Sequence, residues 1–190
     1  MERMQEVLDF WLNDVGYDGW YEAVDAVDAE IRRKFLTLWE DLLAGRIDHW
    51  CSTAQGALAF LIIADQFSRN MFRGDGRSFA ADSKARDVAR VAIARNLDME
   101  VPEPQRVFFY MPLEHSEDFS DQDWSVSLMD NRLPATGKEF AVHTRAHREI
   151  IRRFGRFPFR NKALGRVSSA DEEAFMSQGG YGSVVRELDG

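Results

Sequence analysis

Apolar side chains recur every three or four residues along most of the chain, which is the spacing of an amphipathic α-helix. One such series predicts a helix near residues 2–13, and the next predicts a helix that begins at Asp25 or Asp28 and ends at Gly45. Residues 56–64 are apolar on nearly every side. A helix of that kind is buried, so we expect it at the centre of the fold.

The same periodicity predicts the remaining helices over residues 79–95, 105–113, 121–133, 138–154 and 170–177. Ser52-Thr53-Ala54-Gln55 has the pattern of a capping box that opens the central helix, and Ser168 or Ser169 with Glu172 caps the last one. The glycine-rich end, residues 179–190, is predicted to be a mobile tail. About eight helices and no strand predict an all-α fold of antiparallel hairpins.

Length and composition agree with a single globular domain over residues 1–190, since 45% of the side chains are hydrophobic and 29% are charged. One cysteine, Cys51, excludes a disulfide framework and multi-cysteine zinc sites. The longest apolar run, Ala57–Ala64, is too short to span a bilayer, and no signal peptide is visible at the start. We therefore expect a soluble, cytoplasmic protein that does not bind a membrane; the oligomeric state is not readable.

The net charge is −8, from 32 acidic and 24 basic residues, which argues against binding to nucleic acid. The charge is uneven: acids gather over Glu114–Asp123 and basic residues over Arg145–Arg166. These segments either neutralise each other or form a pocket whose basic wall accepts an anion.

A carboxylate follows the most apolar helix, in the segment Asp65-Gln66-Phe67-Ser68-Arg69-Asn70-Met71-Phe72-Arg73. Burial of Asp65 requires a partner, and Arg69 lies four residues on along the same helical face. The pair either orders the helix end or orients Arg69 or Arg73 toward a carboxylate or phosphate.

Two segments carry histidines. His115, Ser116 and Glu117 lie together after a predicted helix end, where they suit acid–base chemistry or simply cap the next helix. His143 and His147 are one helical turn apart, a spacing that can chelate a metal if His115, Glu117 or Asp118 completes the site. Two histidines alone do not make a site, so we predict neither a metal nor a cofactor.

A turn rich in arginine and phenylalanine follows the long helix, Arg152-Arg153-Phe154-Gly155-Arg156-Phe157-Pro158-Phe159-Arg160-Asn161. Its aromatic residues would anchor the turn, so that Arg156 and Arg160 project as an anion clamp. The alternative is a helix end whose arginines interact favourably with the negative end of the helix dipole and pair with the acidic segment.

These segments, together with Val7-Leu8-Asp9-Phe10-Trp11 and Met111-Pro112-Leu113-Glu114, resemble the bacterial domain-of-unknown-function family 924 over nearly the whole chain. The resemblance implies a tetratricopeptide-like all-α fold and leaves the activity open. The family pattern carries over onto Asp65, Gln66, Arg69, Asn70, Arg73, His115, Ser116, Glu117, His147, Arg156, Arg160 and Asn161. This chain departs from the family pattern at two positions. Members of the family often have proline where Ser68 stands and histidine where Phe159 stands. His143 is not part of the pattern.

Three functions remain open from the sequence. The first is a binding module in which the arginines, with Asp65, Gln66, Asn70, Ser116 and Asn161, hold an anionic small molecule or an acidic peptide. The second is a hydrolase that uses His115 or His147 as a base with Glu117 or Asp65 as its orienting carboxylate. The third is a buried polar network that fixes the helix arrangement, with a protein partner bound elsewhere.

Overall fold

The computed structural model describes residues 2–189. It is 76% helical, and no strand occurs in that range, so the predicted all-α class is confirmed. Within the described range, no helix combines the length and apolarity needed to cross a membrane. The chain divides into two compact units, Met1–Pro112 and Leu113–Gly190, and each is described by itself. The single domain and the tetratricopeptide-like arrangement stay predictions.

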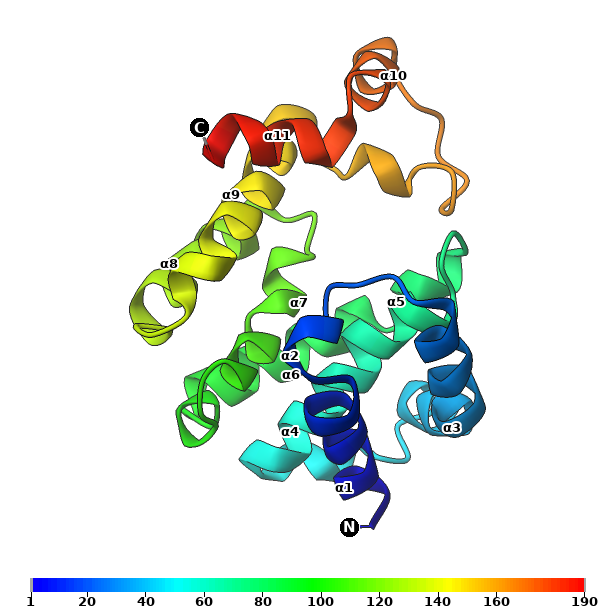
Figure 1. Cartoon of the computed structure of the whole chain (residues 1–190), viewed down its shortest axis with the longest axis vertical. Helices are drawn as coiled ribbons and strands as arrows, with labels where there is room; N and C mark the ends of the chain where they lie inside the picture. Colours follow the sequence, from blue (N-terminus) through cyan, green and yellow to red (C-terminus); the bar gives the residue numbers. More distant parts are fainter. Residues whose placement is uncertain (1, 190) are drawn as a thin grey trace. The chain divides into compact units, whose positions relative to one another are not determined.

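Unit 1 contains helices of very different length (Figure 1). Its helices are α1 Glu2–Asp9, α2 Gly16–Gly19, α3 Asp25–Leu43, α4 Ala54–Leu61, α5 Ser68–Met71 and α6 Asp82–Ala94. A seventh, α7 Met111–Glu114, crosses the boundary between the units. The helices predicted near residues 2–13, 25–45 and 79–95 hold approximately. The helix predicted over 105–113 is instead a 3₁₀ helix, Gln105–Phe109, followed by the short helix α7. Asn96, after α6, adopts the left-handed conformation with φ of 57°.

The predicted central helix is confirmed. Helix α4 and the π-helical turn after it, Ile62–Phe67, are buried. Phe67 stacks on Phe35 with ring centroids 4.8 Å apart and meets Trp11 edge-on at 5.5 Å. This packing fixes the turn, and with it the carboxylate of Asp65, at the end of the apolar core.

The predicted capping box at the start of α4 is corrected by one residue. Thr53, not Ser52, is the N-cap, and its hydroxyl accepts a hydrogen bond from the Gly56 amide at 3.2 Å. The Ser52 hydroxyl instead donates to the His49 carbonyl at 3.0 Å. Residues 48–52 form a 3₁₀ helix, so α4 begins only at Ala54 and the residue directly before it is Thr53.

Unit 2 is built on a long helix pair. Its helices are α8 Phe119–Arg132, α9 Gly137–Phe154, α10 Ala170–Ser177 and α11 Gly180–Asp189. Helix α8 lies along α9 (Figure 1). Gly155 ends α9 with φ of 65°, and Ser169 with Glu172 forms the predicted capping box of α10.

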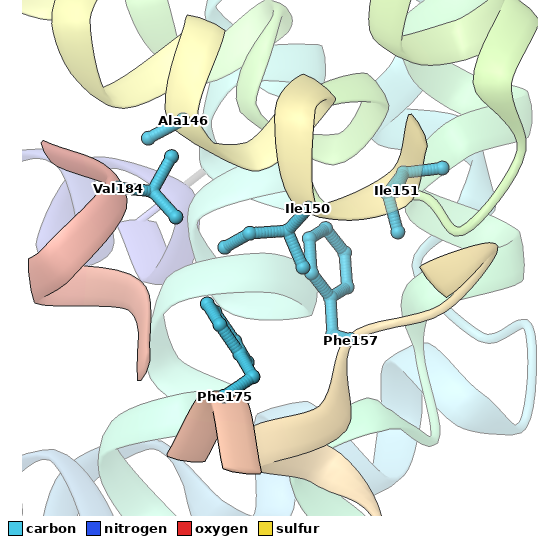
Figure 2. Packing of buried hydrophobic residues seen from close by; sticks show 6 residues of the cluster. All are labelled: Ala146, Ile150, Ile151, Phe157, Phe175 and Val184. Atoms are coloured by element: carbon cyan, nitrogen blue, oxygen red, sulfur yellow. The ribbon is translucent and has the colours of Figure 1, made fainter. Parts of the chain in front are cut away.

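Six buried side chains hold the helices of unit 2 together. They are Ala146, Ile150, Ile151, Phe157, Phe175 and Val184. Figure 2 shows Val184 of α11 beside Ala146 of α9, and Phe157 beside Ile150. The segment predicted as a mobile tail is therefore a packed helix, α11. Its glycines obscure the helical pattern, but burial of Val184 supplies the apolar contact that the helix needs.

Candidate functional site

The residues singled out in the sequence fall into the two units. Unit 1 holds Asp65, Gln66, Arg69, Asn70 and Arg73, and unit 2 holds His115, Ser116, Glu117, His147, Arg156, Arg160 and Asn161.

Asp65 pairs with Arg69, as the helical spacing predicts. Nη1 of Arg69 lies 2.9 Å from Oδ1 of Asp65 and 3.3 Å from Oδ1 of Asp82. Gln66 donates its amide to the other Asp65 oxygen at 2.6 Å. Burial opposes the charge on Arg69, but the two carboxylates raise its pKa above the ordinary value.

Arg73 and Asn70 converge on one carboxylate of α3. Nη2 of Arg73 lies 3.0 Å from Oδ1 of Asp28, and Nδ2 of Asn70 donates to the same oxygen at 2.7 Å. These contacts tie α5 to α3. The guanidinium groups of Arg69 and Arg73 thus face carboxylates of unit 1.

Arg156 and Asn161 share a carboxylate in unit 2. Arg156 donates to both oxygens of Glu172, at 2.6 and 2.7 Å, and Nδ2 of Asn161 lies 3.2 Å from Oε2. Hydrogen bonding from Arg156 lowers the pKa of Glu172 to about 2. The predicted anion clamp at Arg156 is therefore occupied by an acid of the protein itself.

Glu117 and Arg160 have structural contacts around the turn at Phe157. Arg166 donates to both Glu117 oxygens, at 2.7 and 3.0 Å, and the Phe157 amide donates to Glu117 at 2.8 Å. Arg160 lies 4.5 Å from the centre of the Phe157 ring and donates to the His115 carbonyl at 2.9 Å. The Ser116 hydroxyl accepts from the Asp118 amide at 3.2 Å in the turn before α8, whose N-cap is Asp118 and not Ser116.

Glu114, not singled out in the sequence, is the carboxylate that faces a histidine. Its Oε1 lies 2.9 Å from Nδ1 of His147, and its Oε2 accepts from the Thr144 hydroxyl at 3.0 Å. Burial of Glu114 raises its pKa, but His147 outweighs this, helped by the His115 charge and the Thr144 bond. The net result is a pKa below the ordinary value, so Glu114 is a carboxylate at neutral pH.

His115 joins this pair, whereas His143 does not. The rings of His115 and His147 meet edge-on with centroids 5.6 Å apart. One ligand atom from each of Glu114, His115 and His147 lies within 4.8 Å of the others, so the three could hold a metal ion. His143 is exposed, and its Nδ1 lies 2.7 Å from the Tyr181 hydroxyl.

His147 also lines an open pocket of about 530 Å³. The remaining lining residues are Phe159, Met176, Gly179, Gly180, Tyr181 and Gly182. Burial, together with the nearby charge of Glu114, raises the pKa of Tyr181, so its hydroxyl stays protonated. The pocket brings a partly exposed imidazole next to aromatic and sulfur-containing surface and the first turn of α11.

Sequence reasoning identified His115 and His147 but gave them the wrong neighbours. The signal for Glu114 was its position directly before His115. Thr144 and His147 are three residues apart and so share one face of α9, which was a second signal. Tyr181 lies in the segment predicted to be mobile and had no signal.

A model described as bacterial protein of unknown function (DUF924) matches residues 7–180. The chain belongs to the DUF924 family. This DUF924 chain is also similar to the solved structure of a protein of unknown function from Agrobacterium tumefaciens. The two share 35% identity with a TM-score of 0.85, over 93% of this chain and 97% of that one. Among curated proteins, none matches the DUF924 chain.

Proposed function

We propose that unit 2 carries a hydrolase-type acid–base site in which His147 is the general base and Glu114 holds it in position. The observation that supports this most strongly is the 2.9 Å contact between Glu114 Oε1 and His147 Nδ1, on the wall of an open pocket. A carboxylate that orients a histidine beside space for a substrate is the usual arrangement of a general base.

The contacts of Nδ1 determine which ring nitrogen is available. Nδ1 lies 2.9 Å from the Glu114 carboxylate and 2.9 Å from the His143 carbonyl oxygen, and both are acceptors. Nδ1 must therefore carry the hydrogen. In the neutral ring Nε2 is then unprotonated and can accept a proton.

The first turn of α11 offers the complementary group. Gly180, Tyr181 and Gly182 line the pocket at the start of that helix, where the first amides have no acceptor within the helix. Such amides stabilise an oxyanion. The pocket thus favours an ester or amide whose apolar or aromatic group packs against Phe159 and Met176.

In the reaction that we propose, His147 Nε2 takes a proton from water as the water oxygen attacks the carbonyl carbon. The carbonyl oxygen becomes an oxyanion near the α11 amides. When the carbonyl re-forms, the bond to the leaving group breaks and His147 returns the proton to that group. The products are an acid and an alcohol or amine, and the histidine is regenerated.

An anion-binding module is less well supported. Arg69, Arg73 and Arg156 each face a carboxylate, so an anionic ligand would have to displace Asp65, Asp28 or Glu172. Displacing a partner from a partly buried arginine would leave the carboxylate uncompensated, which costs free energy.

The test is hydrolysis of a panel of chromogenic esters and aryl amides that differ in the size of the acyl group. We expect turnover by the wild-type protein and a loss of about 10²–10⁴-fold in kcat for His147→Gln. Glu114→Gln should also lose activity, because a neutral amide no longer stabilises the charged imidazole. His49→Gln, an exposed histidine of unit 1, is the control and should keep full activity. Equal activity of wild type and His147→Gln, or no turnover of any substrate, would contradict the proposal.

A further inference from the structure

Glu114, His115 and His147 form a cluster whose chemistry extends beyond proton transfer. We propose that these three side chains bind one divalent transition-metal ion of the zinc class. One potential ligand atom from each lies within 4.8 Å of the other two. The proposal does not rest on the hydrolase function. A bound ion would take the unprotonated nitrogen of His147, so the metal-bound and proton-accepting forms of this ring are alternative states. Metal binding can be measured without a substrate.

The spacing is wider than that of a formed coordination sphere. Nitrogen and oxygen ligands bind zinc at about 2.0–2.2 Å in a tetrahedron, so two ligands of one ion lie roughly 3.4 Å apart. Ligand atoms that lie within 4.8 Å of one another must therefore approach by about 1.4 Å at most, a movement that rotation of the side chains can supply. Three protein ligands are also the number found in zinc sites that keep a fourth position for water or a substrate.

The neighbours of Glu114 differ from those of the buried carboxylates Asp65 and Glu172. Asp65 faces Arg69 and Glu172 faces Arg156, and both arginines carry a permanent charge. The neighbour of Glu114 is instead the imidazole of His147, a group that can bind a metal ion through a ring nitrogen when neutral. A divalent ion would supply the opposite charge that a buried carboxylate requires.

The surrounding side chains hold the cluster in place. Thr144 is buried, and its hydroxyl donates to Glu114 Oε2, the oxygen that does not contact His147. Thr144 and His147 are both on α9, whose Ala146 and Ile150 belong to the buried core in Figure 2. Hydrogen bonds of this kind around the ligands tune metal affinity.

The ligand types indicate which ions would bind. Two imidazoles and one carboxylate suit zinc, cobalt and nickel, whereas magnesium and calcium favour oxygen ligands alone. His147 also lines the open pocket, so a solvent molecule could reach a bound ion at its free position.

Cobalt titration of the chelator-treated, full-length protein tests the proposal. We expect one Co²⁺ per chain, with visible absorption bands of a low-coordinate site that Zn²⁺ displaces and Mg²⁺ does not. His115→Ala and His147→Ala should each weaken binding by more than about tenfold, and Thr144→Val should weaken it less. His143→Ala is the matched control, since it removes a histidine from the same helix but leaves the three ligands in place.

Absence of the cobalt spectrum in the wild-type protein would overturn the proposal, whatever the variants do. Unchanged affinity in folded His115→Ala would overturn it too, as would loss of binding in His143→Ala, because both would place the metal elsewhere. Helix content by circular dichroism confirms that each variant is folded. Hydrolysis that persists with chelator, without a cobalt spectrum, would reject the metal site but keep the hydrolase. Metal binding without turnover of any substrate would support the metal site and reject the hydrolase.

Discussion

Asp65, Glu114 and Glu172 are buried carboxylates with different neighbours. Asp65 and Glu172 face arginines, so the negative charge of each is balanced by a permanently charged group. Glu114 faces His147 and Thr144. We propose that the same chemical group stabilises the fold in two places and orients the general base in the third.

Replacement of Asp65 tests the structural role at the residue scale. We expect Asp65→Ala to lower the free energy of unfolding by about 3 kcal/mol, because Arg69 is left with an incompletely balanced charge in a buried position. Urea denaturation measures this. The control is Asp130→Ala, which breaks an exposed pair with Arg145 and should cost less than about 1 kcal/mol. Equal losses in both variants would show that Asp65 is not part of a stabilising network.

How far the sequence predicts such pairs depends on their spacing along the chain. The Asp65–Arg69 pair could be predicted because residues four apart share a helix face. The Glu114–His147 contact could not, because the two residues come from α7 and α9 and only the folded chain brings them together. By sequence, Glu117 was an equally good candidate for the carboxylate that orients a histidine, but its carboxylate pairs with Arg166.

At the scale of elements, apolar periodicity predicts most helices but not their irregular turns. The π-helical turns Phe10–Val15 and Ile62–Phe67 continue predicted helices without a visible break in pattern. The periodicity of apolar residues indicates which face of a helix is buried. It does not distinguish the hydrogen bonds of an α-helix, between residues four apart, from those of a π-helix, between residues five apart. Helix α11 was missed because glycines at 179, 180 and 182 resemble a linker.

The start of α4 provides a test at this scale. A Cβ atom on Gly56 would lie 2.0 Å from the Trp50 carbonyl oxygen, so Gly56→Ala forces the helix away from the preceding turn. We expect this variant to lose roughly 3 kcal/mol or more, at the upper end of overpacking effects.

Gly155→Ala is the matched control for this change. Its φ of +65° is strained for alanine, but nothing lies within 4 Å of the added atom. A loss of about 1–2 kcal/mol is expected there. Urea denaturation of both variants decides the matter, and a smaller loss at Gly56 than at Gly155 would refute the close packing of α4.

At the scale of the whole molecule, several carboxylates make stability depend on pH. Hydrogen bonds from Arg77, Arg152 and Arg156 lower the pKa values of Asp75, Glu149 and Glu172, respectively, to about 2. A lowered pKa in the folded state stabilises the fold above the ordinary pKa and stops doing so as the pH falls through the folded value. Asp75 and Glu149 are more exposed than Glu172, so solvent screens their contribution more.

We therefore expect the unfolding free energy to be nearly constant above about pH 5 and to fall between about 4.5 and 2. Glu172→Gln should cost about 1–3 kcal/mol at neutral pH and little near pH 2, because this carboxyl is then about half protonated in the folded wild type and almost fully protonated in the unfolded chain. Urea denaturation across this pH range measures both curves. Parallel curves for the wild type and Glu172→Gln would contradict the lowered pKa of Glu172.

The sequence correctly predicts the features to which many residues contribute, the fold class and the family. Its prediction of the candidate site, which depends on few residues, is incomplete. The all-α class follows from the periodicity of the entire chain, and the family follows from several long motifs. The candidate site depends on contacts between three side chains from separate segments. Local pattern identified two of these residues but could not assign their partner.

The most direct test of the central claim is the ring tautomer of His147, measured by ¹⁵N NMR of the chelator-treated protein at a pH where the ring is neutral. The chain has four histidines, so single substitutions assign the signals. We expect Nδ1 of His147 to carry the hydrogen and Nε2 to be bare, with the Nδ1 signal changed in Glu114→Gln. A ring protonated at Nε2 and bare at Nδ1 would contradict the claim that Glu114 holds His147 as a base.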